Sequence, residues 1–307
     1  MTTLLNEALA AFHLEGCSAE FLGHTENLTY RVDGRYVLRI HKPAEGMHVA
    51  PLPPARRCAE LAFLAHLHRK RLPVQSPVAQ AVLPDGMPAT LLTYLPGQTL
   101  KKEELTPGLL RQAGSLASRL HQAAADHVPA DAPVYDGAHC SAIAQELQAM
   151  AERYCLNADH ARAMLDACTA VGDALDSARQ AFIPIHADLS ASNLILTEQG
   201  LAPIDFSLFG LGHPMFDLSV LMGNIGSLAQ RQAVRDGYLA AGGEIDLRLL
   251  NAGYALGLLG ALHFHADSWP REDWFAPRLE RWAKEMLAPI ARGKMLMNED
   301  MRLLHVD

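Results

Sequence analysis

The sequence predicts an α+β protein of two lobes, a small antiparallel β lobe with one main helix and a larger, mostly helical lobe. Two pairs of β-rich segments, each turned by Asp-Gly, lie within residues 28–95 with one helical stretch between them. From residue 106 onward helical periodicity dominates. We therefore expect an N-terminal lobe at residues 1–96, a hinge at about 93–99 and a C-terminal lobe at 97–307.

The elements of the first lobe follow from periodicity and turn residues. Apolar side chains at helical spacing mark helices, and β-rich runs around Asp-Gly mark hairpins, because Gly accepts the positive φ of a tight turn. The expected elements are a helix at 4–12, a hairpin of 28–32 with 36–40, a helix at 55–68 and a hairpin of 80–83 with 89–95. After the last strand, Pro96-Gly97 predicts the hinge.

The second lobe is expected to be helical around a short β insertion. Short apolar runs at 182–185, 194–196 and 201–204 predict strands, and Glu198-Gln199-Gly200 supplies the turn between the last two. Apolar stripes predict the helices. These lie at 106–121, 143–155, 160–178, 214–222, 229–241, 247–265 and 274–290.

Composition excludes several function classes. The chain has 307 residues, half of them apolar, and a net charge of -8, which argues against binding nucleic acid through phosphate neutralisation. Its five cysteines form no CxxC pair, which indicates free thiols in a reducing compartment. The N-terminus lacks a secretory signal pattern, and the longest apolar stretch, 254–264, is too short to cross a bilayer. We expect a cytoplasmic monomer or homodimer that does not associate with a membrane.

Three polar side chains follow the short strands of the insertion. Asp188 and Asn193 lie in the loop after the first strand, and Asp205 follows the third. Phosphoryl transfer needs a carboxylate to orient and deprotonate a hydroxyl, and hard oxygen ligands for the cation that neutralises phosphate charge. The spacing His-x-Asp-x-x-x-x-Asn is that of a kinase catalytic loop. The competing interpretation is an ordinary polar surface loop.

The segment resembles the aminoglycoside phosphotransferase and choline kinase-like family. His186, Asp188 and Asn193 match its H-G-D-x-x-x-x-N motif, and Ile204-Asp205-Phe206 matches its I-D-F segment, while Ala187 replaces the usual Gly and Ser207 a frequent Asp. The resemblance implies a bilobal protein kinase-like fold, a small-molecule hydroxyl as acceptor, and ATP and Mg²⁺ as cofactors. It also implies that Asp188 and His186 are catalytic residues and that Asn193 and Asp205 bind the metal.

Nucleotide-binding residues are expected in the first lobe. Asn27 begins the family pattern N-x-x-Y-x-V, in a loop without G-x-G-x-x-G, and Arg39 stands where relatives usually carry a phosphate-binding lysine. Glu60 is expected to pair with Arg39, although an ordinary surface arginine and a helix-dipole acid are the alternatives. Lys42 should point away from Arg39 and into solvent. The family also places the nucleotide base against the hinge, here Thr93, Tyr94 and Leu95.

Two further positions have competing interpretations. Asp217 resembles the family aspartate that anchors the catalytic loop from the next helix, or it is simply a first-turn acid. His263 and His265 would diverge on a helix, which favours a helix end over a metal site.

The preferred function is transfer of the ATP γ-phosphoryl group to a small-molecule hydroxyl, such as an aminoglycoside-, choline- or homoserine-like acceptor. A protein Ser/Thr kinase and a non-catalytic nucleotide-binding regulator remain as alternatives. Residues 1–96 hold nine Lys and Arg against eight Asp and Glu, and residues 97–307 hold 17 against 26. This negative field favours a cationic or polar acceptor.

Overall fold

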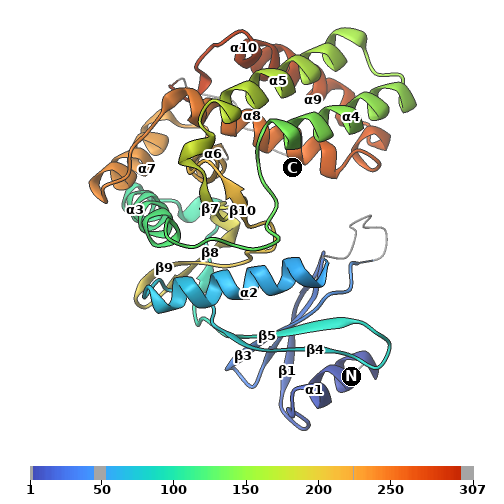
Figure 1. Ribbon diagram of the computed structural model, residues 1–307, viewed down its shortest axis with the longest axis vertical. Helices are drawn as coiled ribbons and strands as arrows, with labels where there is room; N and C mark the ends of the chain where they lie inside the picture. Colours follow the sequence, from blue (N-terminus) through green and yellow to red (C-terminus); the bar gives the residue numbers. More distant parts are fainter. Residues whose placement is uncertain (1–2, 45–52, 224, 299–307) are drawn as a thin grey trace. The chain divides into compact units, whose positions relative to one another are not determined.

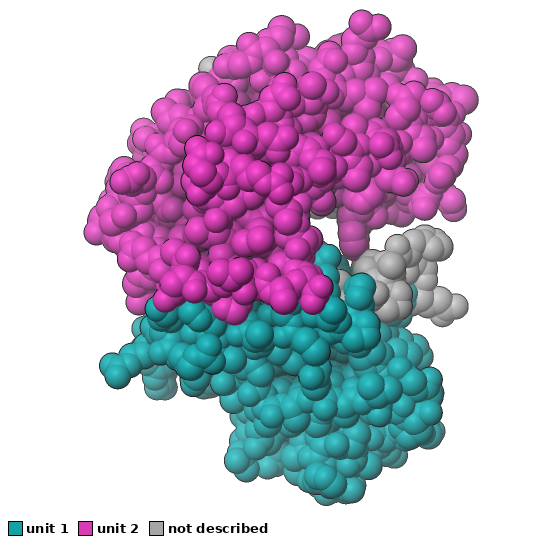
Figure 2. Space-filling model, viewed as in Figure 1, with its two compact units in different colours: residues 1–98, 195–207 teal, residues 99–194, 208–307 magenta. Residues whose placement is uncertain are grey.

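The computed structural model describes residues 3–44, 53–223 and 225–298. Contacts divide the chain into two units, coloured in Figure 2: residues 1–98 with 195–207, and residues 99–194 with 208–307. The division falls close to the expected hinge, but the first unit also takes in a segment that we had placed in the C-terminal lobe. The assignment of residues 1–96 to a nucleotide-binding lobe and of 97–307 to a catalytic and acceptor-binding lobe stays a prediction.

A five-stranded antiparallel sheet in the order β1-β2-β3-β5-β4 forms the centre of the first unit. Helices α1 and α2 lie on opposite faces of this sheet (Figure 1). The strands are β1 (Ala19–His24), β2 (Leu28–Val32), β3 (Tyr36–Ile40), β4 (Pro77–Val82) and β5 (Pro88–Thr93), and the helices are α1 (Thr3–Ala11) and α2 (Pro54–Arg69).

The period-two alternation of β3 divides its side chains between those faces. Leu38 and Ile40 join the apolar cluster under α1, whereas Arg39 points to the other face, where it meets Glu60 of α2. Lys42, beyond the end of the strand, is exposed, as the alternation predicts. The alternation of side chains along β3 thus determines that Arg39 is the residue that contacts α2.

A smaller, three-stranded sheet has the order β6-β8-β9. Its strands are β6 (Gln98–Thr99), β8 (Leu194–Thr197) and β9 (Gly200–Pro203). After β9, Phe206 packs its ring against Phe63 of α2, with 5.8 Å between ring centroids. This contact fixes the segment that carries Asp205 within the first unit.

The second unit is mostly helical. Its elements are α3 (Pro107–Ala124), α4 (Gly137–Arg153), α5 (Ala158–Asp176), β7 (Ile183–Ile185), β10 (Gly210–Gly212), α6 (Met215–Gly223), α7 (Leu228–Ala240), α8 (Leu247–Phe264), α9 (Phe275–Trp282) and α10 (Ala288–Ala291). Short 3₁₀ turns lie at Lys102–Glu104, Arg179–Ala181, Ala191–Asn193, Trp269–Arg271 and Leu296–Asn298. Helix α3 packs on α7, α4 on α5 and α6 on α8.

Glycine lets α3 and α7 approach closely. A Cβ on Gly114 of α3 would lie 1.9 Å from the Val234 carbonyl oxygen, and one on Gly237 of α7 would lie 2.0 Å from that of Arg111. No side chain fits at either point, so the two helix backbones are in direct contact there. This contact lies beside Tyr238, the residue after Gly237, and about two turns before His121 of α3.

The structure confirms the predicted α+β fold class, an antiparallel sheet with one main helix and a mostly helical unit. The short strands β6 and β10 were not expected, and two other elements also differ from expectation. Strand β1 was not expected, because half of its residues are exposed and its sequence shows no apolar alternation. The helix expected at 274–290 is interrupted by a π-helical turn at Ala283–Leu287 between α9 and α10. Along the described ranges, no helix is long and apolar enough to cross a bilayer.

Candidate active site

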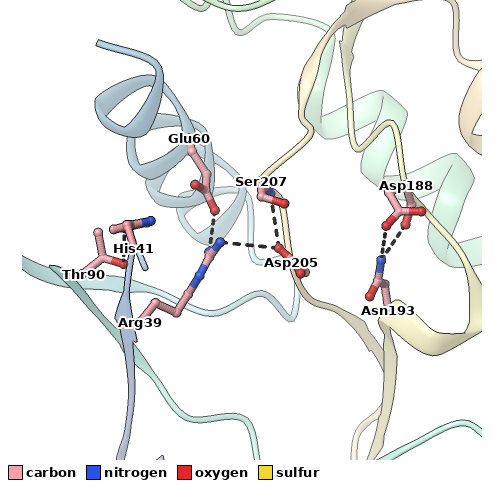
Figure 3. A network of polar contacts seen from close by, with 8 residues as sticks. All are labelled: Arg39, His41, Glu60, Thr90, Asp188, Asn193, Asp205 and Ser207. Atoms are coloured by element: carbon pink, nitrogen blue, oxygen red, sulfur yellow. Dashed lines mark hydrogen bonds and ion pairs between the residues drawn. The ribbon is translucent and has the colours of Figure 1, made fainter. Parts of the chain in front are cut away.

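The loop between β7 and β8 brings Asp188 and Asn193 together in the second unit (Figure 3). Asn193 Nδ2 donates to Asp188 Oδ2 at 2.7 Å and to the Asp188 backbone oxygen at 2.9 Å. The carboxylate is therefore held in one orientation while it remains partly accessible. Since both bonds use the amide nitrogen, the amide oxygen is the atom of Asn193 that suits a hard cation.

Asp217, in the first turn of α6, holds the start of this loop. It is fully buried, and its two carboxylate oxygens accept the backbone N–H of His186 at 2.9 Å and of Ala187 at 2.7 Å. Hydrogen bonds to a buried carboxylate are charge-assisted and strong. This is the contact that an anchoring role requires; the effect of the anchor on catalysis stays a prediction.

Ala187 and His186 show how tightly the loop is constrained. Ala187 has φ +65°, in the left-handed region of backbone conformation. That conformation costs an L residue about 1–2 kcal/mol, so the loop is held by its surroundings. The fully buried His186 ring accepts the Asp188 N–H on Nδ1 at 3.3 Å. In the described structure His186 thus supports the backbone of Asp188, and a direct catalytic part for it stays a prediction.

In the first unit, Arg39 lies between two carboxylates (Figure 3). Its Nη1 donates to Glu60 Oε1 at 2.7 Å, and its Nη2 lies 3.5 Å from Asp205 Oδ1. The Arg39 and Glu60 side chains are 8% and 4% exposed, whereas that of Asp205 is 49% exposed. Arg39 and Glu60 therefore form a buried ion pair with an accessible third carboxylate beside it.

The charge state of Arg39 follows from these neighbours. Burial by itself would lower the pKa of Arg39, but the Glu60 carboxylate and then Asp205 outweigh it, and the pKa is raised. The guanidinium stays charged. The structure excludes the alternative of an ordinary surface arginine, and the contact with Arg39 gives Glu60 more than a helix-dipole role.

Asp205 and the residues around it complete this group. Asp205 has φ +60°, and its Oδ1 accepts the Ser207 N–H at 3.4 Å. The turn directs the carboxylate toward Arg39 while leaving about half of it exposed. Glu26, in the loop after β1, adds a further negative charge near Arg39.

The other residues expected to contact nucleotide lie at strand ends of the first unit. The Asn27 carbonyl oxygen accepts the Thr25 N–H at 3.3 Å and closes the short loop before β2. At the end of β5, Thr93 Oγ1 accepts the Ser76 N–H at 2.7 Å. The Tyr94 N–H donates to the Arg35 carbonyl at 2.8 Å. Leu95 is partly buried. Their part in nucleotide binding stays a prediction.

His41, one strand period beyond Arg39, was not singled out from the sequence. It is buried beside Thr90, with 3.3 Å between Nε2 and Oγ1. Burial, then the charges of Arg39 and Arg57, lower its pKa from 6.5 to about 3. The ring is therefore neutral at neutral pH and fills space without adding charge to the Arg39 group.

This pKa predicts an acid-sensitive stability. Between pH 6.5 and about 3 the unfolded chain protonates His41 while the folded protein does not. The free energy of unfolding must therefore fall as the pH is lowered through this window. His41→Gln should lose less stability than the wild type, by up to about 3 kcal/mol at pH 4. Denaturant unfolding at a series of pH values measures this. The exposed His68→Gln is the control, and equal pH slopes for wild type and His41→Gln would contradict the prediction.

The described residues contain no group of three or more His, Cys, Asp or Glu side chains that could hold a metal by themselves. His265 stacks on Trp269, with ring centroids 4.3 Å apart and an interplanar angle of 9°, and His263 is exposed.

Comparisons with known proteins agree with the fold and the motifs. The family model described as "Phosphotransferase enzyme family" matches residues 18–255. This protein therefore belongs to the phosphotransferase enzyme family, and the resemblance seen in the sequence is confirmed. A search of proteins with curated descriptions found no match.

Solved structures similar to this chain have the protein kinase-like fold. A choline/ethanolamine kinase family protein from Mesorhizobium loti is 20% identical with a TM-score of 0.67, over 95% of this chain and 97% of that one. A microcompartment-associated aminopropanol kinase is 19% identical with a TM-score of 0.64, over 96% and 99%. An amicoumacin kinase in complex with AMP-PNP, Ca²⁺ and Ami is 17% identical with a TM-score of 0.66, over 87% of each chain. At these identities the likeness shows the fold.

Proposed function

We propose that this protein transfers the γ-phosphoryl group of ATP to a hydroxyl group of a small molecule. The observation that carries the proposal is the Asp188 carboxylate, oriented by Asn193 in a loop whose backbone is fixed by Asp217. A fixed, partly accessible carboxylate can accept the proton of an acceptor hydroxyl and align its oxygen for in-line attack. His186, being buried, would act by holding Asp188 in place.

Residues of the first unit would bind the nucleotide. Arg39 supplies a permanent positive charge and a planar donor fork for phosphate oxygens, and Glu60 holds that fork. The backbone at Thr93, Tyr94 and Leu95 would contact the base, and the loop at Asn27 the phosphates. A cytoplasmic location, expected from the five free cysteines, is part of the proposal.

Asn193 and Asp205 would hold Mg²⁺. An amide oxygen and a half-exposed carboxylate are the hard oxygen donors that this ion prefers, and nucleotide phosphates and water complete its shell. When bound, the ion neutralises phosphate charge. Two protein ligands suffice for such a site, which fits the residues present.

Loss of Asp205 should remove the magnesium-dependent part of ATP binding. In Asp205→Ala we expect the ATP dissociation constant to be nearly the same with Mg²⁺ as with EDTA, whereas in the wild type Mg²⁺ tightens binding. Titration calorimetry measures both. Ser207→Ala, two residues along the same segment, should respond to Mg²⁺ like the wild type. The same Mg²⁺ dependence in Asp205→Ala and wild type would remove Asp205 from the metal site.

Arg39 should tolerate lysine better than methionine. Arg39→Lys keeps the charge near the phosphates but loses the fork, so we expect weaker ATP binding than in the wild type and tighter binding than in Arg39→Met. The same calorimetric titration ranks the three proteins. Equal losses in both variants would show that the fork geometry is essential, and unchanged binding in both would exclude Arg39 from nucleotide binding.

The acceptor is proposed to be cationic or polar. The segment 97–307, which carries Asp188, holds 26 acidic against 17 basic residues. A negative field attracts cations, although salt screens it beyond about 8 Å. Two similar structures are named for amino alcohols, aminopropanol and choline/ethanolamine. Both observations favour an acceptor that carries an amine beside its hydroxyl.

A screen for ADP release tests the proposed function. Aminoglycosides, choline, amino alcohols, sugars and a generic protein substrate are incubated with ATP and Mg²⁺, and Asp188→Asn serves as the inactive control. Turnover of amine-bearing alcohols is the expected result. Turnover of the protein substrate alone would establish a protein kinase, and turnover restricted to anionic acceptors would overturn the charge argument.

A further inference from the structure

A tyrosine that precedes α4 is bonded twice to the segment that leads into β10. The Tyr135 hydroxyl donates to the Leu208 backbone carbonyl oxygen at 2.5 Å. Its backbone N–H donates to the Leu211 carbonyl at 2.8 Å, and the Leu211 N–H donates to the Pro133 carbonyl at 2.8 Å. Tyr135 therefore holds this segment at two points three residues apart, one through its side chain and the other through its backbone.

The backbone bonds add residues 133–135 to the small sheet of the second unit. Val134 pairs with Leu211 in parallel, and β10 pairs antiparallel with β7, the strand that leads into the catalytic loop (Figure 1). Asp136, the next residue, caps α4 by accepting a backbone N–H of the first helical turn at 3.1 Å. The backbone of Tyr135 is thus held on both sides, by a strand pairing and by a helix cap.

The ring of Tyr135 is fixed as well. It is 8% exposed and packs against the ring of Phe216, with 5.4 Å between centroids, and against that of His139, with 4.9 Å. Gly210 leaves room for it, because a Cβ there would lie 2.7 Å from Tyr135 Cε2. A ring enclosed by residues of α4, α6 and β10 has few alternative rotamers, so its hydroxyl is directed to one point.

Leu208 depends on this hydroxyl for its position. Its side chain is 36% exposed, so packing holds it weakly, and the Tyr135 hydroxyl is the hydrogen-bond partner among the contacts described for it. The chain passes from the first unit to the second between Ser207 and Leu208. Before this point, the Phe206 ring is packed on Phe63 at 5.8 Å. The Ser207 residue is therefore flanked by two anchored neighbours.

The backbone of Ser207 orients the Asp205 carboxylate. The Ser207 N–H donates to Asp205 Oδ1 at 3.4 Å, and the same oxygen lies 3.5 Å from Arg39 Nη2. Asp205 has φ +60°, a conformation that persists in a non-glycine residue only while its surroundings hold it. If Leu208 loosened, the Ser207 peptide could turn, and the carboxylate would lose the backbone donor that directs it.

We propose that Tyr135 is a positioning residue for Asp205: its hydroxyl fixes Leu208 and, through the Ser207 peptide, the direction of the Asp205 carboxylate. The part of this proposal that concerns Mg²⁺ rests on the proposed function, whereas the part that concerns the order of the segment does not. Tyr135 touches neither the nucleotide nor the metal in this role.

The test compares two tyrosine variants of the full chain with the wild type. Tyr135→Phe removes the hydroxyl and keeps the ring with its packing, so the fold should be retained. Tyr154→Phe is the matched control, because the Tyr154 hydroxyl also donates to a backbone carbonyl, that of Asp267 at 3.1 Å, and has no contact with residues 204–212 among those described for it. Amide hydrogen exchange over 204–212 and calorimetric titration with ATP, in Mg²⁺ and in EDTA, are measured for each protein.

In Tyr135→Phe we expect faster exchange at the Ser207 and Leu211 amides, because both lie in the segment that the hydroxyl holds. The factor by which Mg²⁺ tightens ATP binding should fall about fivefold, the equivalent of one hydrogen bond. The dissociation constant of ATP in EDTA should equal that of the wild type, because Arg39 and Glu60 are untouched. Tyr154→Phe should match the wild type in both measurements. A general loss of structure would weaken ATP binding in EDTA as well, so the two titrations separate positioning from unfolding.

Wild-type exchange over 204–212 in Tyr135→Phe would overturn the proposal, and so would faster exchange with an unchanged Mg²⁺ dependence of ATP binding. Equal weakening of ATP binding in Mg²⁺ and in EDTA would overturn it too, since Tyr135 would then support the fold and not Asp205. If ATP binding by the wild type does not respond to Mg²⁺, the metal site of the proposed function alone is refuted, because exchange still decides whether Tyr135 holds the segment.

Discussion

Asp188→Asn is expected to lower kcat by about 10² to 10⁴-fold, the usual cost of removing a positioned general base. Asn keeps the size of Asp, and its amide oxygen can still accept the hydrogen bond that Asn193 Nδ2 donates to Oδ2 in the wild type. The loop should therefore keep its conformation while the side chain loses its basicity. The KM for ATP should change by less than about threefold, because Asp188 is not among the residues proposed to bind nucleotide.

Ser192→Ala provides the matched control for this measurement. Ser192 lies in the same loop, is exposed, and bonds only the Ser190 hydroxyl among the contacts described for it. Its variant should turn over at the wild-type rate. Wild-type kcat in Asp188→Asn, measured with an acceptor found in the screen, would show that Asp188 is not the base and would leave the fold assignment unaffected.

Local sequence signals predicted most elements of this fold. The two hairpins turn at Asp33-Gly34 and Asp85-Gly86, where Gly adopts the positive φ that a tight turn requires. The helices of the second unit follow strong apolar stripes. Strand β1 was not predicted, because an edge strand with exposed Phe21 and Leu22 has neither of these signals.

The residues of the candidate site that belong to a local sequence motif were predicted. Those that join the site only through tertiary contacts were not. His-x-Asp-x-x-x-x-Asn is local, so Asp188 and Asn193 could be named from spacing. The partners of Asp217 could not, because His121 lies 96 residues away and Tyr238 joins only through the packing of α3 on α7. One signal was present: His121 is a polar residue within an apolar helical stripe, and a buried polar group requires a partner.

The ion pair of Arg39 shows the same limit of sequence analysis for charged residues. Its position on a strand and the acid on the next helix indicated a pair, but only the fold shows that the pair is buried. This difference changes its energetic meaning, since an exposed pair contributes about 0–1 kcal/mol, whereas a buried charge that loses its partner is strongly destabilising.

Glu60→Leu is therefore expected to lower the free energy of unfolding by about 3–5 kcal/mol, because it removes the nearest carboxylate from the buried Arg39 guanidinium and leaves the more distant one of Asp205. Urea unfolding of the purified variant measures this loss. Glu280→Gln is the control: Glu280 pairs with Lys284 on the surface of the second unit, where both side chains are more than half exposed. Its variant should unfold at the same urea concentration as the wild type, because salt and solvent screen an exposed ion pair.

The double variant Arg39→Met/Glu60→Leu separates the pair from the residues. Replacing a whole buried ion pair by apolar side chains of similar size is often neutral, so the double variant should recover most of the stability that Glu60→Leu loses. The losses of unfolding free energy in Arg39→Met and Glu60→Leu, added together, should exceed the loss in the double variant by more than about 1 kcal/mol. This difference is the coupling expected of residues in contact. Additive losses would show that Arg39 and Glu60 stabilise the first unit independently, in contradiction to the 2.7 Å ion pair. ATP binding should still be weakened in the double variant, because the phosphate-binding charge is gone even where stability is restored.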